Sequence, residues 1–243
     1  LIQLAAPDGM NEKISLTYAT TAGCIDDWLS REHDQSALGF DTETRPSFRK
    51  GEVYPPATLQ LSTATSTLVV HLLHLDQMPQ SLVDVLASAS TLKVGIGVDD
   101  DAVDLWLHHG LDVNARLDLV AEGACESDAK SLRGLTEEVL GVQLSKSRKL
   151  TLTNWSRRGL TAAELRYAAL DAWAGRALHD ELTRRRRPGA DAGFSTNSAW
   201  RPVQLEAGEG LHDLVPAEAR SCAELYMYRR CRRVVREQFA TID

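Results

Sequence analysis

The sequence predicts an α/β fold in which helices flank a mixed sheet, followed by a C-terminal helical extension. Apolar, strand-like runs come first, at 37–43, 57–63 and 66–73, and helical patterns are interleaved later. A nearly continuous apolar run at 91–98 is typical of a buried central strand. With 43% hydrophobic and 25% charged residues, the 243-residue chain can build a substantial core.

The early elements follow from local patterns. A helix is predicted over 21–33, because Thr21 is a good N-cap and apolar residues then recur at helical spacing. The runs 57–63 and 66–73 lie close enough together to predict a hairpin. A short helix is expected over 81–88.

The later elements are mostly helical. A helix over 99–110 begins on acidic residues and ends at Gly110, in agreement with the helix dipole and the C-terminal preference for glycine. Another short helix is closed by Gly141. After a basic connection at 142–159, Thr161 opens a long helix, and Glu164 completes a T-x-x-E capping box with it.

Three segments are expected along the chain. Residues 1–187 form the main domain, and the aperiodic stretch 188–215 is a linker or strap. Residues 216–243 form a basic amphipathic helix, which could lie against the domain, bind nucleic acid or dock on a protein partner. Its arginines are Arg229, Arg230, Arg232, Arg233 and Arg236.

Composition excludes some classes of protein. No apolar run approaches the ~20 residues that cross a membrane. The net charge of −7 argues against a protein that simply coats nucleic acid, but not against an enzyme with a local basic patch or metal ions. Scattered cysteines, without zinc-finger spacing, favour reduced thiols in an intracellular protein, and the start at Leu1 suggests a trimmed or partial chain.

Two carboxylates, Asp41 and Glu43, directly follow an apolar strand. Residues i and i+2 of a strand point to the same side, so the two groups can converge. Their mutual repulsion needs protons or cations to offset it, and Mg²⁺ or Mn²⁺ favours carboxylate oxygens. The alternative is a solvated strand end or an N-cap.

Further acids lie later in the chain. Asp99, Asp100 and Asp101 follow the 91–98 strand, where helix capping is the simpler explanation for any one of them. Tyr167 and Asp171 share one helical face at i, i+4 spacing, at the head of an otherwise inward-facing stripe. Asp171 therefore needs a partner, either an arginine or a metal ion.

These motifs resemble the DEDD superfamily of 3′-5′ exonucleases, specifically its tyrosine-containing (DEDDy) branch, which includes ribonuclease D and the Werner-syndrome-type exonuclease domain. "FDTE" matches the first motif at Asp41 and Glu43, and "KVGIGVDDDAVDL" matches the second at Asp101, with Asp100 as the alternative. "NWSRRGLTAAELRYAALDA" carries the third motif at Tyr167 and Asp171. The resemblance covers roughly residues 20–183.

The resemblance implies a ribonuclease H-like fold and two-metal hydrolysis of DNA or RNA from the 3′ end, releasing nucleoside monophosphates. By analogy Asp41 would bridge two Mg²⁺ or Mn²⁺ ions, and Glu43 and Asp171 would complete the site of the ion that activates water. Asp101 would support the second ion, and Tyr167 would orient the attacking water rather than titrate. The alternative is an inactive scaffold of the same fold that binds nucleic acid or protein.

Basic residues near the third motif are candidates for contacts with a single-stranded or 3′-recessed nucleic acid. Arg148 and Lys149 are predicted to contact the backbone, because the corresponding loop of Werner-type relatives lies near the active site. Arg158 is a further candidate, although a solvated face is the more common explanation for any of these basic residues. Trp155 could supply a stacking platform, but we expect it in the core.

Overall fold

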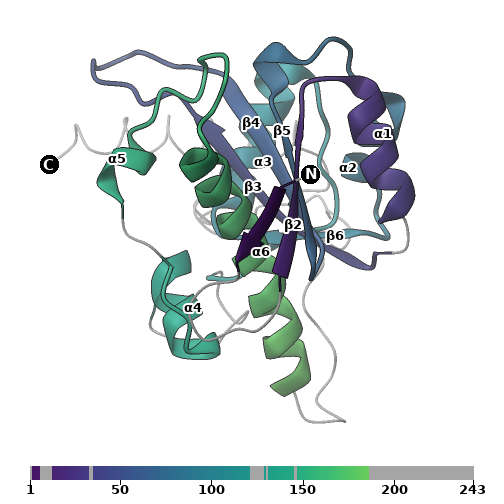
Figure 1. The fold of residues 1–243 in the computed structure, drawn as a ribbon, viewed down its shortest axis with the longest axis vertical. Coiled ribbons are helices and arrows are strands. Elements are labelled where there is room, and N and C mark those ends of the chain that lie inside the picture. The colour runs from purple at the N-terminus through teal and green to yellow at the C-terminus, as the bar shows by residue number, and fades with distance from the viewer. Residues whose placement is uncertain are drawn as a thin grey trace, which may run out of the picture.

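A seven-stranded mixed sheet runs through the centre of the molecule, with helices on both faces (Figure 1). The computed structural model describes residues 2–5, 13–32, 35–120, 129, 131–144 and 147–185. The strands are β1 Ile2–Ala5, β2 Lys13–Ala19, β3 Ala37–Thr44, β4 Pro56–Ser62, β5 Ser66–Val70, β6 Leu92–Gly95 and β7 Arg116–Asp118. Their order in the sheet is β1-β2-β5-β4-β3-β6-β7.

The central strand β3 pairs antiparallel with β4 and parallel with β6. The antiparallel β4–β5 pair confirms the predicted hairpin. The mixed sheet with flanking helices confirms the predicted fold class. Strands β1, β2 and β7 are not among the predicted elements.

The helices form two layers. The helices α1 (Ala22–Arg31), α2 (Gln80–Ala87) and α3 (Val98–His109) pack on one face, where their apolar residues meet Leu38 and Phe40 of β3. The helix α6 (Ala162–Arg185) packs on the other face, together with α4 (Leu132–Leu140). The short helices η1 (Leu72–His74) and α5 (Arg148–Thr151) complete the described elements.

Predicted caps are confirmed at the start of two helices, α1 and α6, and at the end of two others, α3 and α4. The Thr21 hydroxyl accepts a hydrogen bond from the backbone N–H of Cys24 at the start of α1. Glu164 Oε2 accepts from the Thr161 backbone N–H at 2.7 Å, and the Thr161 hydroxyl accepts from the Glu164 N–H at 3.3 Å. Gly110 and Gly141 end α3 and α4 in the left-handed conformation.

The structure corrects two boundaries. The strand predicted over 91–98 ends at Gly95, because α3 already begins at Val98. Gly97, with φ of +75°, occupies the N-cap, so none of the three consecutive acids caps the helix. They lie in its first turn instead, where the helix dipole favours negative charge. Within the predicted connection at 142–159, residues 148–151 form α5.

Lys93 of β6 is fully buried and binds the end of α2. Its ammonium donates hydrogen bonds to the carbonyls of Val85 at 3.2 Å, Ser88 at 2.8 Å and Thr91 at 2.7 Å. Burial lowers the pKa of Lys93 to about 7, and the charge of Arg116 adds to that effect.

The predicted linker at 188–215 and the predicted helix at 216–243 lie outside the described residues. Among the residues that are described, none of the helices has both the length and the apolar content needed to cross a bilayer.

Candidate metal centre

Strand β3 delivers two carboxylates to the face covered by α6. Its side chains alternate, so Phe40 is buried in the cluster with α1, α2 and α3, whereas Asp41 and Glu43 point to the opposite side. The β3–β4 register breaks at a β-bulge between Glu43 and Thr44. Bulges of this kind re-aim side chains near functional sites.

Helix α6 lies directly on the backbone of β3, because glycine leaves room for it. A Cβ atom added at Gly39 would lie 1.9 Å from the carbonyl oxygen of Ala172. One built on Gly175 would lie 2.7 Å from the carbonyl oxygen of Val94 in β6. This close approach places Asp171, the residue before Ala172, over the end of β3.

The structure brings Asp41, Glu43 and Asp171 together. Each offers one carboxylate oxygen, and these three oxygens lie within 4.8 Å of one another. The side chains are half-buried. Asp171 therefore faces two other acids, and the arginine partner considered from the sequence does not explain it.

Asp101 reaches the same site from α3. Its carboxylate Oδ1 accepts a hydrogen bond of 2.7 Å from the hydroxyl of Thr42, the residue between the two β3 acids. Its neighbours in sequence behave differently, since Asp99 pairs with Arg116 at 2.8 Å and Asp100 is exposed. Of the three consecutive acids, Asp101 is the one directed at the β3 carboxylates.

Burial raises the pKa values of all four acids, and the charges of neighbouring acids raise those of Asp41 and Glu43 further. Burial and the charges of Asp101, Glu43 and Asp171 raise the pKa of Asp41 well above its usual range. Burial and the charges of Asp171 and Asp101 raise the pKa of Glu43 to about 9. Burial raises the pKa of Asp101 to about 7 and that of Asp171 to about 6. A group of carboxylates that resists ionisation in this way needs protons or cations.

Tyr167 lies beside this cluster on α6. Burial, followed by the charges of Asp171 and Glu43, raises the pKa of its phenol, so the hydroxyl stays protonated near neutral pH. It is hydrogen-bonded to Asp171 and to Thr151 at the end of α5. A protonated phenol that contacts an acid of the cluster can position a polar molecule next to it.

The basic residues predicted to contact nucleic acid differ in where they lie relative to the acid cluster. Lys149 is exposed on α5, the helix whose Thr151 contacts Tyr167. Arg158 is exposed in the turn before α6. Arg148 opens α5, but its side chain is outside the described part of the structure. Trp155 is fully buried with its ring centroid 6.2 Å from that of Tyr167, so it belongs to the core as expected.

Two polar residues beside the acids, Gln60 and Asp118, were not predicted. Gln60 of β4 is paired with Asp41 in the sheet, is fully buried and donates to the Thr58 hydroxyl at 2.7 Å. Asp118, which ends β7, accepts a hydrogen bond of 2.9 Å from the Gly97 backbone N–H at the start of α3. Polar residues at 58 and 60, alternating within an otherwise apolar strand, were the available signal for Gln60.

The donor set fits hard divalent cations. Its atoms are carboxylate oxygens, which Mg²⁺ and Mn²⁺ prefer, and no cysteine or histidine belongs to it among the described residues. Burial, and after it the charges of the neighbouring acids, raise the pKa values of Asp41 and Glu43, as expected of acids that lack a compensating cation. Asp41, Glu43 and Asp171 could therefore hold an ion directly, and Asp101 lies close enough to add a further ligand or a water-mediated one.

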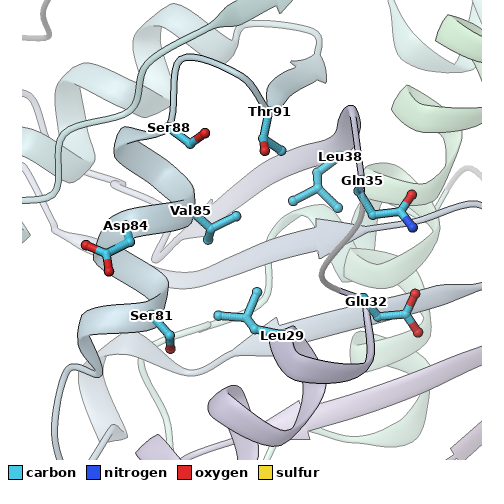
Figure 2. Close-up of a pocket in the computed structure, with 9 residues that line it drawn as sticks. All are labelled: Leu29, Glu32, Gln35, Leu38, Ser81, Asp84, Val85, Ser88 and Thr91. Carbon is cyan, nitrogen blue, oxygen red and sulfur yellow. The ribbon is translucent and has the colours of Figure 1, made fainter.

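A separate cavity of about 310 Å³ lies near the opposite end of β3, between α1 and α2 (Figure 2). The side chains of Leu29, Leu38 and Val85 point toward its centre, whereas the carboxylates of Glu32 and Asp84 point away from one another. It gathers no cluster of catalytic groups comparable to the one at the other end of the strand.

Comparison with known proteins finds similarity over most of the described chain. Residues 17–186 match the family model described as 3′-5′ exonuclease. A 3′-5′ exonuclease of Arabidopsis thaliana is 36% identical over 163 residues, which are 63% of this chain and 56% of that protein. The bifunctional 3′-5′ exonuclease/ATP-dependent helicase WRN of Mus musculus is 31% identical over 161 residues, which are 65% of this chain and 12% of that protein.

A solved structure shows the same fold. The EXO domain of Aedes aegypti Nibbler matches with a TM-score of 0.61 at 21% identity, covering 74% of this chain and 92% of that one. In length, the chain spans about half of the Arabidopsis thaliana exonuclease and a small part of the Mus musculus WRN protein.

Proposed function

Because the chain belongs to the 3′-5′ exonuclease family, we propose that it hydrolyses DNA or RNA from the 3′ end by a two-metal mechanism, releasing nucleoside monophosphates. The observation that carries this proposal is the convergence of Asp41, Glu43 and Asp171 oxygens within 4.8 Å, from segments far apart in the sequence. Such a cluster lowers the folding stability of the metal-free protein. Destabilising clusters of this kind are typical of functional sites, where the chemistry requires the negative charge.

In this mechanism the acids have different tasks. Asp41, at the centre of the cluster, would bind both Mg²⁺ or Mn²⁺ ions, with Glu43 and Asp171 on one side and Asp101 on the other. The ions supply stabilisation of the developing phosphate charge and activation of water. Thr42 holds Asp101 at 2.7 Å, so the acid on α3 keeps a fixed relation to the β3 pair.

Tyr167 would orient the attacking water. Its phenol is protonated and is already hydrogen-bonded to Asp171 and Thr151, so its oxygen is fixed beside the acids. It acts as a hydrogen-bonding group rather than as a base, because burial and the nearby negative charges oppose its ionisation.

The test is cleavage of a 5′-labelled single-stranded or 3′-recessed oligonucleotide with Mg²⁺ or Mn²⁺. A ladder that shortens from the 3′ end supports the proposal, and binding without shortening favours the inactive scaffold. Asp41→Ala is expected to lower the rate at least about 100-fold while the protein stays folded. Asp27→Ala, an exposed acid on α1, is the matched control and should cleave normally.

Whether the substrate is RNA or DNA depends on how the site treats the sugar. Distinguishing RNA from DNA requires contacts that detect the 2′-hydroxyl, so rates on matched DNA and RNA oligonucleotides decide it. We also propose an intracellular setting, in keeping with Cys24, which is free in the described structure. A protein partner for residues 216–243 stays a prediction.

A further inference from the structure

Strand β4 carries two polar side chains, Thr58 and Gln60, on the face of the sheet that meets α6. Leu59 and Leu61 alternate with them and belong to the apolar cluster on the opposite face. Every residue of β4 is buried, and apolar side chains are the usual occupants of a strand that is covered on both faces. Packing alone therefore does not account for the polar pair.

The pair stands opposite the two acids of β3. The antiparallel register places Gln60 opposite Asp41 and Thr58 opposite Glu43. The Cβ atoms of residues that stand opposite one another in such a pair are about 5 Å apart, and their side chains share one face of the sheet. Gln60 Nε2 donates a hydrogen bond of 2.7 Å to the Thr58 hydroxyl, so the amide is held on the face that the acids occupy.

The amide of Gln60 is hydrogen-bonded at one end only. The side chain is fully buried, and its Oε1 has no hydrogen-bond partner among the described residues. Burying a carbonyl oxygen without a donor costs free energy, and buried polar groups in folded proteins are nearly always paired. Ionised Asp41 and Glu43 cannot pair with it, because a carboxylate has only acceptor oxygens.

The burial of Gln60 limits the size of a donor that can reach it. A nucleic-acid strand cannot contact a fully buried side chain, whereas water commonly pairs with buried polar groups. Asp41, Glu43 and Asp171 (the acid cluster) offer one oxygen each, which leaves part of the octahedral shell of Mg²⁺ to water. Water bound to a divalent cation is a strong donor, because the positive charge polarises it.

We propose that Gln60 is a positioning residue of the metal centre, and that its Oε1 accepts a hydrogen bond from a water molecule bound to a cation in the acid cluster. This inference rests on the proposed function, because it concerns the same acids. Thr58 fixes the direction of the amide through its hydroxyl. Groups that hold the ligands of a metal in this way commonly change metal affinity by about 10- to 100-fold.

Metal binding and stability together test the proposal on the full chain. Gln60→Met removes both polar atoms of the amide, and Thr58→Val is combined with it so that no hydroxyl is left without its donor. The Mn²⁺ affinity of this double variant, measured by calorimetry without nucleic acid, should fall about tenfold or more. Its melting temperature in EDTA should equal or exceed that of the wild type, because an unpaired buried oxygen has been removed. A purely structural role predicts the reverse, a lower melting temperature with unchanged Mn²⁺ affinity.

A second readout concerns the bound water itself. At saturating Mn²⁺, the relaxation of water protons reports how fast water on the ion exchanges with solvent, and the exchange should be faster in the double variant. Thr58→Val alone keeps Gln60 but frees its amide to turn, so a smaller loss of Mn²⁺ affinity is expected.

Thr17→Val is the matched control. Thr17 of β2 is buried, and its hydroxyl also has no hydrogen-bond partner among the described residues. It stands opposite Leu68 of β5, which belongs to the cluster on the other face of the sheet from the acids. Mn²⁺ affinity and water exchange should therefore stay at their wild-type values.

Wild-type Mn²⁺ affinity and water exchange in the double variant would overturn the proposal, and so would a wild-type protein that binds no Mn²⁺. If both affinity and melting temperature fall, the water exchange decides, and a wild-type exchange rate counts against Gln60. If Mn²⁺ binding depends on Gln60 but the wild type shortens no oligonucleotide, the exonuclease proposal fails and the role of Gln60 stands. Cleavage by a wild type whose Mn²⁺ binding does not depend on Gln60 gives the reverse.

Discussion

The contact between Gly39 of β3 and Ala172 of α6 yields the sharpest prediction. Gly39→Ala adds one methyl group where the structure has no space for it, since the new Cβ would lie 1.9 Å from the Ala172 carbonyl oxygen. That oxygen belongs to the helix backbone, so no side-chain rotation relieves the clash. The helix must move away from the strand.

The size of the movement follows from the distance. Real Cβ contacts are essentially never shorter than 3.0 Å, so α6 must retreat by at least about 1.1 Å. Overpacking of this kind costs about 1–3 kcal/mol, more than the gain from replacing a strand glycine by alanine. Since 1 kcal/mol shifts the melting temperature of a domain of this size by about 2–4 °C, we expect a loss of about 2–12 °C.

The site should suffer more than the fold. Asp171 precedes Ala172 and moves with α6, whereas Asp41 and Glu43 stay on β3, so the oxygens that now lie within 4.8 Å of one another are drawn apart. A misplacement of ~1 Å can cost about 100-fold in rate. We therefore expect weaker Mn²⁺ binding by calorimetry and a comparable loss of cleavage, at a temperature where far-UV circular dichroism shows a folded protein.

Gly23→Ala is the matched control. Gly23 lies in α1 with nothing within 4 Å of its added Cβ, so the same substitution should stabilise the protein by about 0.5–1 kcal/mol and leave Mn²⁺ binding unchanged. If Gly39→Ala melts at the wild-type temperature and binds Mn²⁺ equally well, α6 does not rest on β3 at this point, and the account of how the acids converge is wrong.

Three other predictions concern single side chains. Tyr167→Phe should lower kcat about 10- to 100-fold with Mn²⁺ affinity unchanged, and a wild-type kcat would contradict its orienting role. The free energy of unfolding of the metal-free protein should fall as pH rises from about 5 to about 9, because the raised pKa values of Asp41 and Glu43 keep protons on the folded state that the unfolded state has released. Chemical denaturation of Asp41→Asn across this pH range should show a shallower fall. An equal slope in the two proteins would refute this explanation. Lys93 acts in the opposite direction, because its pKa of about 7 in the folded protein lies below its value in the unfolded chain. The free energy of unfolding of the wild type, relative to that of Lys93→Met, should therefore rise between about pH 7 and 10. A difference that does not change with pH would show that the ammonium is not desolvated.

Much of the site could be predicted because its signals are local. The same-side projection of Asp41 and Glu43 follows from the strand period, and the shared face of Tyr167 and Asp171 follows from the helix period. The apolar runs before the acids predicted buried strands, and β3 and β6 are found there. Resemblance to the exonuclease family added the expectation that these segments meet in one site, and the structure brings Asp41, Glu43 and Asp171 together.

The remainder depends on contacts between distant segments. β7 has three residues, too few for a periodic pattern, and it exists because β6 offers it a parallel edge. β2 does carry an alternation at Ile14 and Leu16, but its partner β5 is about fifty residues away. The need for glycine at position 39 appears only when α6 is laid on the strand.

The β-bulge after Glu43 has a consequence for length variation in this chain. One residue inserted between Gly39 and Asp41 would reverse the alternation and send both acids toward the α1–α3 face, away from Asp171. An insertion beyond the bulge, in residues 45–55, leaves the alternation of the acids intact. The hairpin can therefore lengthen or shorten at its tip, and diverge in what it touches, without disturbing the carboxylates at its base.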